Sequence, residues 1–182
     1  MKRSDLMSVQ TISTSLKTAV LSAGMMSMFL SFHEKPSQAV LCIVLAAALA
    51  GFDGYIEKKL RLANEFGKEF RSLAELITFG AAPSLIVYLV ILYKMPVSGL
   101  LLAALFIICG ALRLARFNIS TCVNRYHTGL PIHVAGSILA VSALWSPLLY
   151  QREMTVILVI ILCCLMVSRI KIPAISQTKS YP

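Results

Sequence analysis

The sequence predicts an all-α integral membrane protein with six transmembrane helices and both termini in the cytoplasm. Composition is the first observation: 58% of the 182 residues are hydrophobic and only 14% are charged, whereas a soluble domain carries roughly 25% charged residues. The second observation is a series of apolar runs long enough to cross a bilayer. The third is the placement of Lys and Arg, which gather on one side of these runs.

The six predicted spans follow one another without a linker or an internal repeat, so residues 1–182 are expected to form one domain. The spans lie at 18–32, 38–52, 72–93, 96–114, 129–150 and 154–170, within a bundle that covers 18–175. The first run is short in strictly apolar residues and is expected to begin before Lys17. Ahead of it, residues 1–17 place apolar side chains at helical spacing, which suits a helix lying on the membrane surface.

The distribution of positive charge predicts the orientation. With the N-terminus inside, the outer side carries Lys35, Lys94 and Arg152, which leaves 17 − 3 = 14 Lys and Arg for the cytoplasmic side. An excess of this kind in short loops is typical of the cytoplasmic face, and attraction to anionic headgroups adds to it. We therefore expect a multi-pass protein of the plasma membrane with its active site on the cytoplasmic side. The net charge of +9 is explained by topology, so no nucleic-acid partner is expected.

Charged residues are crowded into residues 49–76, which hold five of the eight acidic residues of the chain. The stretch begins with Asp53, at the cytoplasmic end of the second predicted span. An Asp deep in a span costs roughly 2.5–3.5 kcal/mol, so such residues are usually functional. Near the end of a span the cost is smaller, and the alternative remains an ordinary helix-end turn followed by a solvated helix face.

Spacing adds a geometric expectation. Asp53 and Glu57 are four residues apart and share a helix face, as do Arg71 and Glu75. Two helices that enter the membrane around residues 63–67 would bring these pairs towards each other. The result would be a polar pocket at the cytoplasmic membrane surface, and carboxylates that converge there suit hard cations such as Mg²⁺.

The same stretch resembles the signature of the CDP-alcohol phosphatidyltransferases, D-x-x-D-G-x-x-A-R-x8-G-x-x-x-D-x-x-x-D. Asp53 and Gly54 fall on its "DG", Gly67 on the later Gly, and Glu75 on the last Asp. The wording "EFGKEFRSLAELITFGAAPSLIVY" is most similar to the phosphatidylserine synthase branch. Two later segments, "ICGALRLARFNIS" and "TGLPIHVAG", resemble the fourth span and the start of the fifth span of that branch.

The resemblance implies a transferase that holds two divalent ions, Mg²⁺ or Mn²⁺, on the pyrophosphate of CDP-diacylglycerol. The metal ligands would be Asp53 and Glu75, joined by Glu57 if its side chain turns inward. Glu75 would also deprotonate the hydroxyl of serine, whose oxygen attacks the β-phosphorus while CMP leaves. The metal ions would neutralise the phosphate charge. The family forms homodimers through its spans, so a homodimer in the lipid bilayer is expected.

Further residues would bind the phosphates in this comparison. The glycines of the signature, Gly54 and Gly67, would let a phosphate or nucleotide approach the backbone closely, with Lys58 in place of the signature Arg. Arg113 and Arg116 match the "RLARFN" of the branch and are expected on the same side of the pocket. They would hold a phosphate or the serine carboxylate, or they are a topogenic pair.

Several signature positions are degenerate. The first Asp is Ala50, the third is Arg71 and the fourth is Glu75. With Asp53, the four positions carry 0 − 1 + 1 − 1 = −1 in place of −4. A guanidinium about 5 Å from a divalent ion is repelled by roughly 6–7 kcal/mol at an effective dielectric of 20. Elsewhere, His133 replaces the last Pro of "GLPIP".

Two functions therefore stay open, and with them the question of whether the chain is an enzyme. The first is phosphatidylserine synthase-like transfer with impaired catalysis, in which Arg71 bridges Asp53 and Glu75 in place of a metal. The second is a non-catalytic protein that binds the CDP-lipid or pairs with an intact synthase. A metal would be required only by the active form. A transporter is disfavoured, because no pair of broken spans and no mid-bilayer charges are found.

Overall fold

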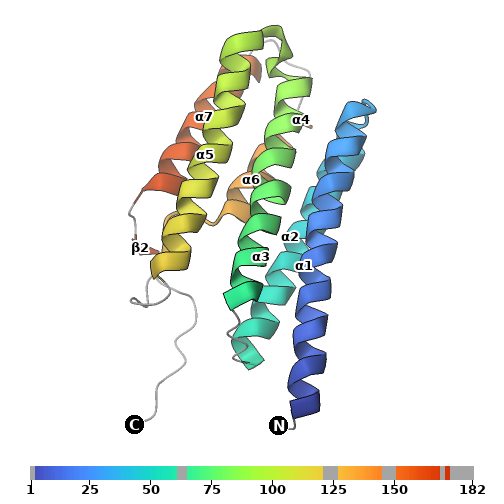
Figure 1. The fold of residues 1–182 in the computed structure, drawn as a ribbon. Helices are drawn as coiled ribbons and strands as arrows, with labels where there is room; N and C mark the ends of the chain where they lie inside the picture. Colours follow the sequence, from blue (N-terminus) through green and yellow to red (C-terminus); the bar gives the residue numbers. More distant parts are fainter. Residues whose placement is uncertain (1–2, 61–64, 121–126, 145–150, 169–170, 173–182) are drawn as a thin grey trace.

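The computed structural model describes residues 3–60, 65–120, 127–144, 151–168 and 171–172, and this part of the chain is almost entirely helical. The helical elements in chain order are α1 (Arg3–Phe32), α2 (Pro36–Leu60), α3 (Glu65–Glu75), the π-helical turn η1 (Leu76–Ala81), α4 (Ala82–Val90), the 3₁₀ turn η2 (Leu92–Lys94), α5 (Pro96–Ser120), α6 (Ile132–Ser142) and α7 (Gln151–Val167). Two short strands, β1 (His127–Thr128) and β2 (Lys171–Ile172), pair antiparallel. Figure 1 shows α1, α2, the continuous α3–η1–α4 helix and α5 running alternately up and down the bundle.

Among the described residues, four helices are long and apolar enough to cross a membrane, which confirms the membrane class. These candidate spans are Thr11–Phe32, Pro36–Glu57, Glu65–Val90 and Val97–Ile119. The other two helices are shorter, with 11 residues in α6 and 17 in α7, whereas a span needs about 20. Part of the predicted span 129–150 lies outside the described residues. The six-span topology, with both termini inside, stays a prediction.

The helices extend beyond the predicted apolar runs on the side of the polar stretch. α1 is one continuous helix from Arg3, so residues 3–17 are not a separate element, and its apolar span begins at Thr11, before Lys17, as expected. α2 continues to Leu60, which places Asp53 inside a helix and excludes the helix-end turn. The third predicted span starts seven residues early, at Glu65. These extensions carry polar residues that pair between helices, which lets the helical structure continue past the apolar sequence.

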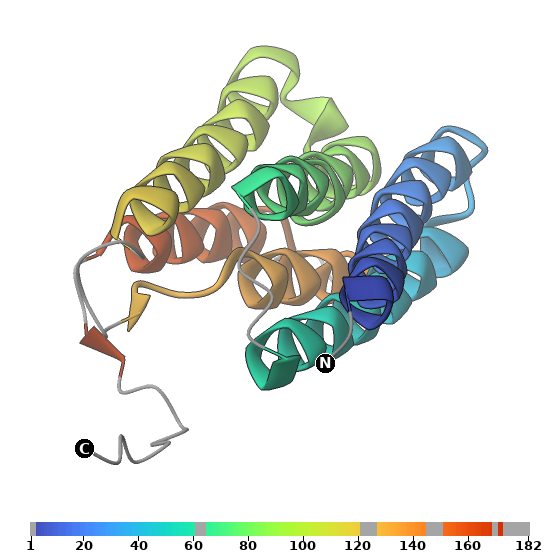
Figure 2. The same ribbon diagram turned by 60° about the horizontal axis from the view of Figure 1, so that its bottom comes forward.

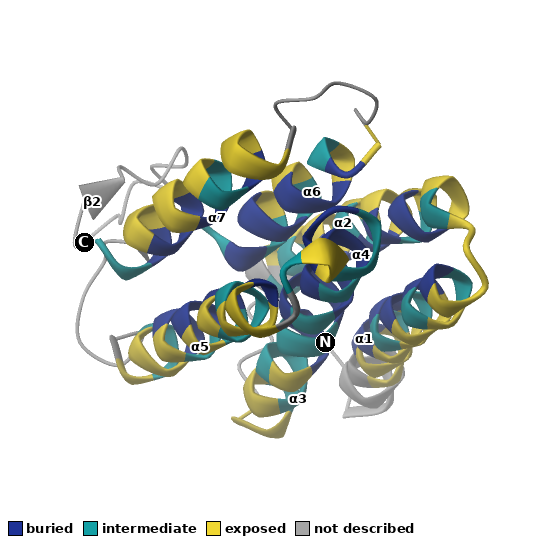
Figure 3. Cartoon of the chain, turned by 90° about the horizontal axis from the view of Figure 1, so that it is seen from above, coloured by how far each residue is buried: buried dark blue, intermediate teal, exposed yellow. Residues whose placement is uncertain are grey.

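One stripe of α1 faces the bundle. Its buried residues recur at the three- and four-residue steps of a helix face: Ser13, Lys17, Val20, Gly24, Ser27 and Ser31. α1 packs mainly on α2 along this stripe, and the Ser27 hydroxyl donates a hydrogen bond to the carbonyl oxygen of Ala39, 2.9 Å away. Figure 3 shows the same division in other helices, with buried residues towards the centre and exposed residues outside. The exposed side includes many large apolar side chains, as expected for a surface in contact with lipid.

The π-helical turn η1 interrupts the third helix directly after Glu75 and is clamped between α1 and α6. A Cβ atom at Gly24 of α1 would collide with Thr78, and one at Gly136 of α6 would collide with the carbonyl oxygen of Phe79. The Thr78 hydroxyl donates to the carbonyl oxygen of Val20 at 3.0 Å. The close approach of α1 and α6 therefore holds η1 in place directly after Glu75, the predicted base.

Gly136→Ala is expected to destabilise the protein by about 1–3 kcal/mol, because the added methyl group would push against the η1 backbone. Thermal unfolding in mild detergent can be followed by the rise in reaction with a thiol-specific dye above the level given by the exposed Cys164, as the buried Cys109 and Cys163 become accessible. Gly51→Ala is the matched control, since nothing lies within 4 Å of a Cβ at that position. The control is expected to gain up to about 1 kcal/mol in helix propensity. An unchanged midpoint for Gly136→Ala would contradict the clamp.

Candidate functional site

The site lies where the C-terminal half of α2 meets the middle of α1 and the C-terminal half of α3. Figure 2 shows the bundle from the side on which α1 and α3 begin and α2 ends, and α1 contacts both α2 and α3. Residues 61–64, which join α2 to α3, are outside the described residues. The expected convergence of Asp53 and Glu57 with Arg71 and Glu75 is observed, since Arg71 reaches Glu57, and α1 is added as a third helix.

α2 supplies two carboxylates from one face. Asp53 and Glu57 are four residues apart in a continuous helix, which stacks them on neighbouring turns. The Asp53 side chain is 3% exposed and that of Glu57 is 22% exposed. Glu57 therefore turns inward, which was the condition for its inclusion in the site.

α3 supplies Arg71 and Glu75, also four residues apart. The Arg71 Nε donates to Oε1 of Glu75 at 2.8 Å, and its NH1 donates to Oε2 of Glu57 at 3.0 Å. The expected bridge between Asp53 and Glu75 is thus half correct. Arg71 does bind Glu75, but its second carboxylate is Glu57, because the inward turn of Glu57 brings that oxygen within reach of the guanidinium.

α1 supplies Lys17. From the sequence, this lysine is expected only as one of the positive charges on the cytoplasmic side. Its ammonium lies 2.6 Å from Oε1 of Glu57 and 3.4 Å from Oδ2 of Asp53. It also donates to the Ser13 hydroxyl at 2.5 Å, while that hydroxyl donates to Oδ1 of Asp53 at 2.8 Å. Ser13 and Lys17 are four residues apart and share the helical spacing of the other buried residues of α1. This spacing is the sequence signal that could have predicted both residues in the site.

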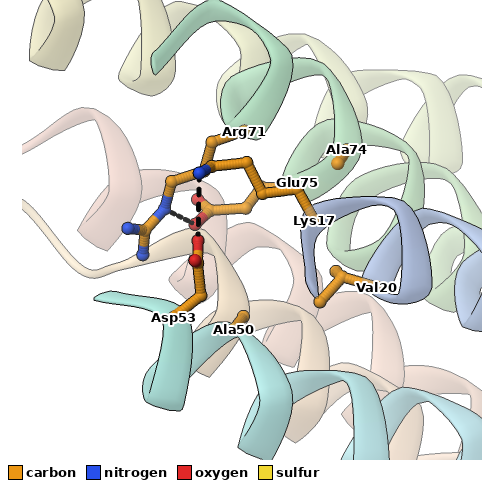
Figure 4. A pocket seen from close by; sticks show the side chains of 7 residues that line it. All are labelled: Lys17, Val20, Ala50, Asp53, Arg71, Ala74 and Glu75. Carbon is orange, nitrogen blue, oxygen red and sulfur yellow. Dashed lines mark hydrogen bonds and ion pairs between the residues drawn. The ribbon is translucent and has the colours of Figure 1, made fainter. Parts of the chain in front are cut away.

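We call these five charged residues the ionic cluster: Lys17, Asp53, Glu57, Arg71 and Glu75. Its formal charge is −3 + 2 = −1. A cavity of about 10 Å³ lies against it, lined by Lys17, Val20, Ala50, Asp53, Arg71, Ala74 and Glu75. Figure 4 shows these side chains around one point, with Ala50 beside Asp53. A cavity of this size has room for at most about one water molecule.

The residues present do not fit the two-metal site that the signature implies. Ala50 has no ligand atom, and Arg71 brings a positive charge to a position where a carboxylate is required. Each remaining carboxylate already contacts Lys17 or Arg71. Within the described ranges, no group of three or more His, Cys, Asp or Glu side chains is placed to hold a metal ion.

Three residues of α2 and α3 are predicted to bind phosphate. One of them makes room for another side chain, one is half-buried, and the side chain of the third is outside the described residues. At Gly54, a Cβ atom would lie 3.0 Å from an Arg71 guanidinium nitrogen, so the glycine makes room for Arg71 between α2 and α3. Gly67 is half-buried in the first turn of α3. Lys58 belongs to α2, but its side chain is outside the described residues.

The two arginines of α5 separate, contrary to the expectation that they share one side. Arg113 is 7% exposed, and its guanidinium stacks 5.4 Å from the centre of the Phe117 ring. It lies within electrostatic reach of Glu75 and Arg71. Arg116 is exposed and donates to the carbonyl oxygen of Val167 at 3.0 Å, at the end of α7. Residues three apart are separated by about 60° around a helix, and here this difference is enough to leave the second arginine exposed and in contact with another helix.

Two buried nitrogens near the cluster have no hydrogen-bond partner: Nε of Arg113 and Nδ1 of His133. The His133 ring meets the Phe79 ring edge-on, with centroids 6.2 Å apart. Both side chains are within electrostatic reach of Glu75. The sequence marked His133 only as a departure from a proline, whereas the structure places it close to the cluster.

Arg71→Met is expected to lower the free energy of unfolding by about 1–3 kcal/mol, because buried carboxylates lose their donor. The double variant Arg71→Met/Glu75→Gln is expected to recover part of this loss, since a neutral amide needs no counter-charge. Lys68→Met removes the same charge from an exposed position on α3 and is expected to have little effect. Equal unfolding midpoints for Arg71→Met and Lys68→Met in the dye assay would rule out a stabilising cluster.

Comparison with known proteins agrees with this architecture. The family model described as CDP-alcohol phosphatidyltransferase matches residues 10–168, which include every residue of the ionic cluster. The CDP-diacylglycerol–serine O-phosphatidyltransferase of Bacillus subtilis (strain 168) is 38% identical over 151 residues, which cover 82% of each protein. The enzyme of the same name from Helicobacter pylori (strain ATCC 700392 / 26695) is 36% identical over 163 residues, 86% of this chain and 69% of the relative. The archaetidylserine synthase of Methanothermobacter thermautotrophicus is 31% identical over 156 residues, 85% of this chain and 66% of the relative. The chain is a member of the CDP-alcohol phosphatidyltransferase family.

Proposed function

We propose that this protein is a phosphatidylserine synthase-like member of the family that binds CDP-diacylglycerol and whose transfer of the phosphatidyl group to serine is impaired. The acceptor and donor follow from the names of the relatives, two of which are CDP-diacylglycerol–serine O-phosphatidyltransferases. The impairment rests on one observation above all. Arg71, at a signature position for a carboxylate, binds Glu75 and Glu57 instead of leaving them open to a metal.

Glu75 is the candidate base, and its surroundings support weak activity. The carboxylate already accepts a hydrogen bond from Arg71 at 2.8 Å, so a serine hydroxyl would have to compete with a guanidinium. Glu75 is also one methylene longer than the Asp of the signature. Mechanisms that depend on positioning lose about 100-fold in rate for an error of about 1 Å.

Arg113 is the residue best suited to hold an anionic group of the ligand. It is buried, its Nε has no partner, and it lies within electrostatic reach of Glu75. A guanidinium binds a phosphate or carboxylate through two parallel hydrogen bonds, and an unpaired buried donor favours such a ligand. Gly67 and Lys58 complete the proposed contacts to the nucleotide or lipid phosphate. Arg116 is left out, since it binds the end of α7.

A lipid-tethered substrate requires a site at the membrane edge. We place this site on the cytoplasmic side of the plasma membrane, in accordance with the excess of Lys and Arg, and we expect a homodimer. Mg²⁺ or Mn²⁺ would be needed only to the extent that transfer persists.

The second candidate function is a non-catalytic subunit that binds the CDP-lipid or pairs with an intact synthase. The same pairing of Arg71 with Glu57 and Glu75 favours it, because the pairing stabilises the fold whether or not turnover occurs. The two candidates differ in one measurable quantity, the residual rate of serine transfer.

Transfer of labelled serine to CDP-diacylglycerol in the presence of Mg²⁺ tests the proposal. The variant Ala50→Asp/Arg71→Asp/Glu75→Asp, which also carries Lys17→Met to release Asp53, restores the signature carboxylates. We expect it to exceed the unchanged protein by roughly 100-fold in rate, the magnitude typical of restored positioning. Lys68→Asp/Glu69→Asp makes comparable changes on the exposed face of α3 and is expected to leave the rate unchanged.

Strong Mg²⁺-stimulated transfer by the unchanged protein would contradict impairment. If no variant transfers serine but the unchanged protein still binds CDP-diacylglycerol, the non-catalytic function is supported. Loss of both activities from every variant would contradict the assignment of the CDP-lipid as ligand.

A further inference from the structure

Among the described residues, Lys17 makes close contacts with three side-chain oxygens that the family signature does not account for. A lysine in the interior of a transmembrane helix is costly and is usually paired, and this one is 4% exposed and belongs to a helix outside the signature. We propose that Lys17 and Arg71 are built-in cations that take the place of divalent metal ions, so that the folded site of this protein requires no metal and excludes it. This inference concerns metal binding and does not depend on the acceptor or on the rate of transfer.

The ammonium of Lys17 is fully coordinated. It has three N–H donors and three oxygen neighbours, Glu57 Oε1 at 2.6 Å, Ser13 Oγ at 2.5 Å and Asp53 Oδ2 at 3.4 Å. Ser13 also donates to the second oxygen of Asp53 at 2.8 Å. A Mg²⁺ ion would need these oxygens at about 2.0–2.1 Å. It would therefore have to occupy the volume that the ammonium fills.

Glu57 links the two cations. Its Oε1 binds Lys17 and its Oε2 binds Arg71 at 3.0 Å, so neither oxygen is left without a cation. Arg71 also binds Glu75. The three carboxylates that remain in the cluster are thus shared between two side-chain cations supplied by α1 and α3.

Charge and space oppose an added metal. The cluster carries −3 + 2 = −1, so one divalent ion would bring it to +1 and two would bring it to +3. Like charges in a site of low dielectric repel strongly. Mg²⁺ also tends to keep several of its water ligands, whereas the adjoining cavity of about 10 Å³ holds at most about one water molecule.

Binding of Mn²⁺ to the purified full chain in lipid nanodiscs tests the inference. The free-ion electron paramagnetic resonance signal reports binding, and the thiol-dye assay reports the unfolding midpoint Tm with EDTA or with Mn²⁺. The unchanged protein is expected to show no site-specific binding and the same Tm in both conditions. Lys17→Met/Arg71→Met removes both cations of the cluster and leaves two buried carboxylates and the half-buried Glu57. We expect its Tm to fall in EDTA and to recover with Mn²⁺, with binding at least about tenfold tighter than in the unchanged protein.

Lys59→Met/Lys68→Met is the matched control, because it removes two positive charges from exposed positions on α2 and α3. It is expected to behave like the unchanged protein. The single variant Lys17→Met, which keeps Arg71, is expected to show a smaller recovery with Mn²⁺, while Lys17→Arg retains the charge and is expected to show none.

Mn²⁺ binding by the unchanged protein that raises its Tm and is lost in Asp53→Asn would overturn the inference. So would a failure of Mn²⁺ to stabilise both Lys17→Met and the double variant. If the double variant does not fold, Mn²⁺ binding by the unchanged protein and the Tm of Lys17→Met with EDTA or with Mn²⁺ still test the inference. Metal binding by the unchanged protein would remove the main support for impaired transfer, but it would leave the assignment of the CDP-lipid and serine as substrates intact, since no step of this experiment measures lipid binding or serine transfer.

Discussion

The arrangement of the first three helices depends on the two carboxylate oxygens of Glu57. One oxygen binds an ammonium from α1 and the other a guanidinium from α3, so a single side chain of α2 holds both neighbours. Buried charges are tolerated only when each has a partner and further hydrogen bonds, and this requirement fixes the relative positions of the three helices along their axes. A shift of α1 by one helical turn, about 5.4 Å, would remove Lys17 from both carboxylates.

Much of the fold follows from the sequence, because apolar runs and the placement of positive charge are direct consequences of a bilayer as solvent. The pairing of Asp53 with Glu57 and of Arg71 with Glu75 on shared faces also follows from their four-residue spacing. The choice of partner between helices does not follow, because it depends on how far each helix is rotated. That is why Arg71 was expected on Asp53 and is found on Glu57.

The inward direction of Lys17 does not follow from the sequence either, for a related physical reason. A lysine at the edge of an apolar run satisfies the rule for cytoplasmic charge just as well when it points outward into water as when it points inward. Only the continuation of α1 through residues 3–17 places it opposite the acidic face of α2. The same holds for Arg113 and Arg116. They lie three residues apart in one motif, yet the first side chain is buried and the second is exposed.

The proposed function separates the family fold from the family chemistry. The bundle needs its carboxylates neutralised, and side-chain cations do this as well as metal ions for stability. Catalysis needs more, because a metal ion also has to contact the phosphate whose charge changes during the reaction. The ammonium of Lys17 already has three protein oxygens around it, and Arg71 directs two of its five N–H donors to Glu75 and Glu57, so fewer donors are left for a ligand.

The π-helical turn η1 has a consequence for the geometry of the third helix. A π-helical turn amounts to one extra residue within an α-helix, and one residue corresponds to a rotation of about 100°. The face that carries Arg71 and Glu75 is therefore offset from the face that α4 would present in a regular helix. The extra residue acts as a rotational adjustment between two halves of one span: the polar half packs on α1, while the apolar half packs on α1, α2, α5 and α6.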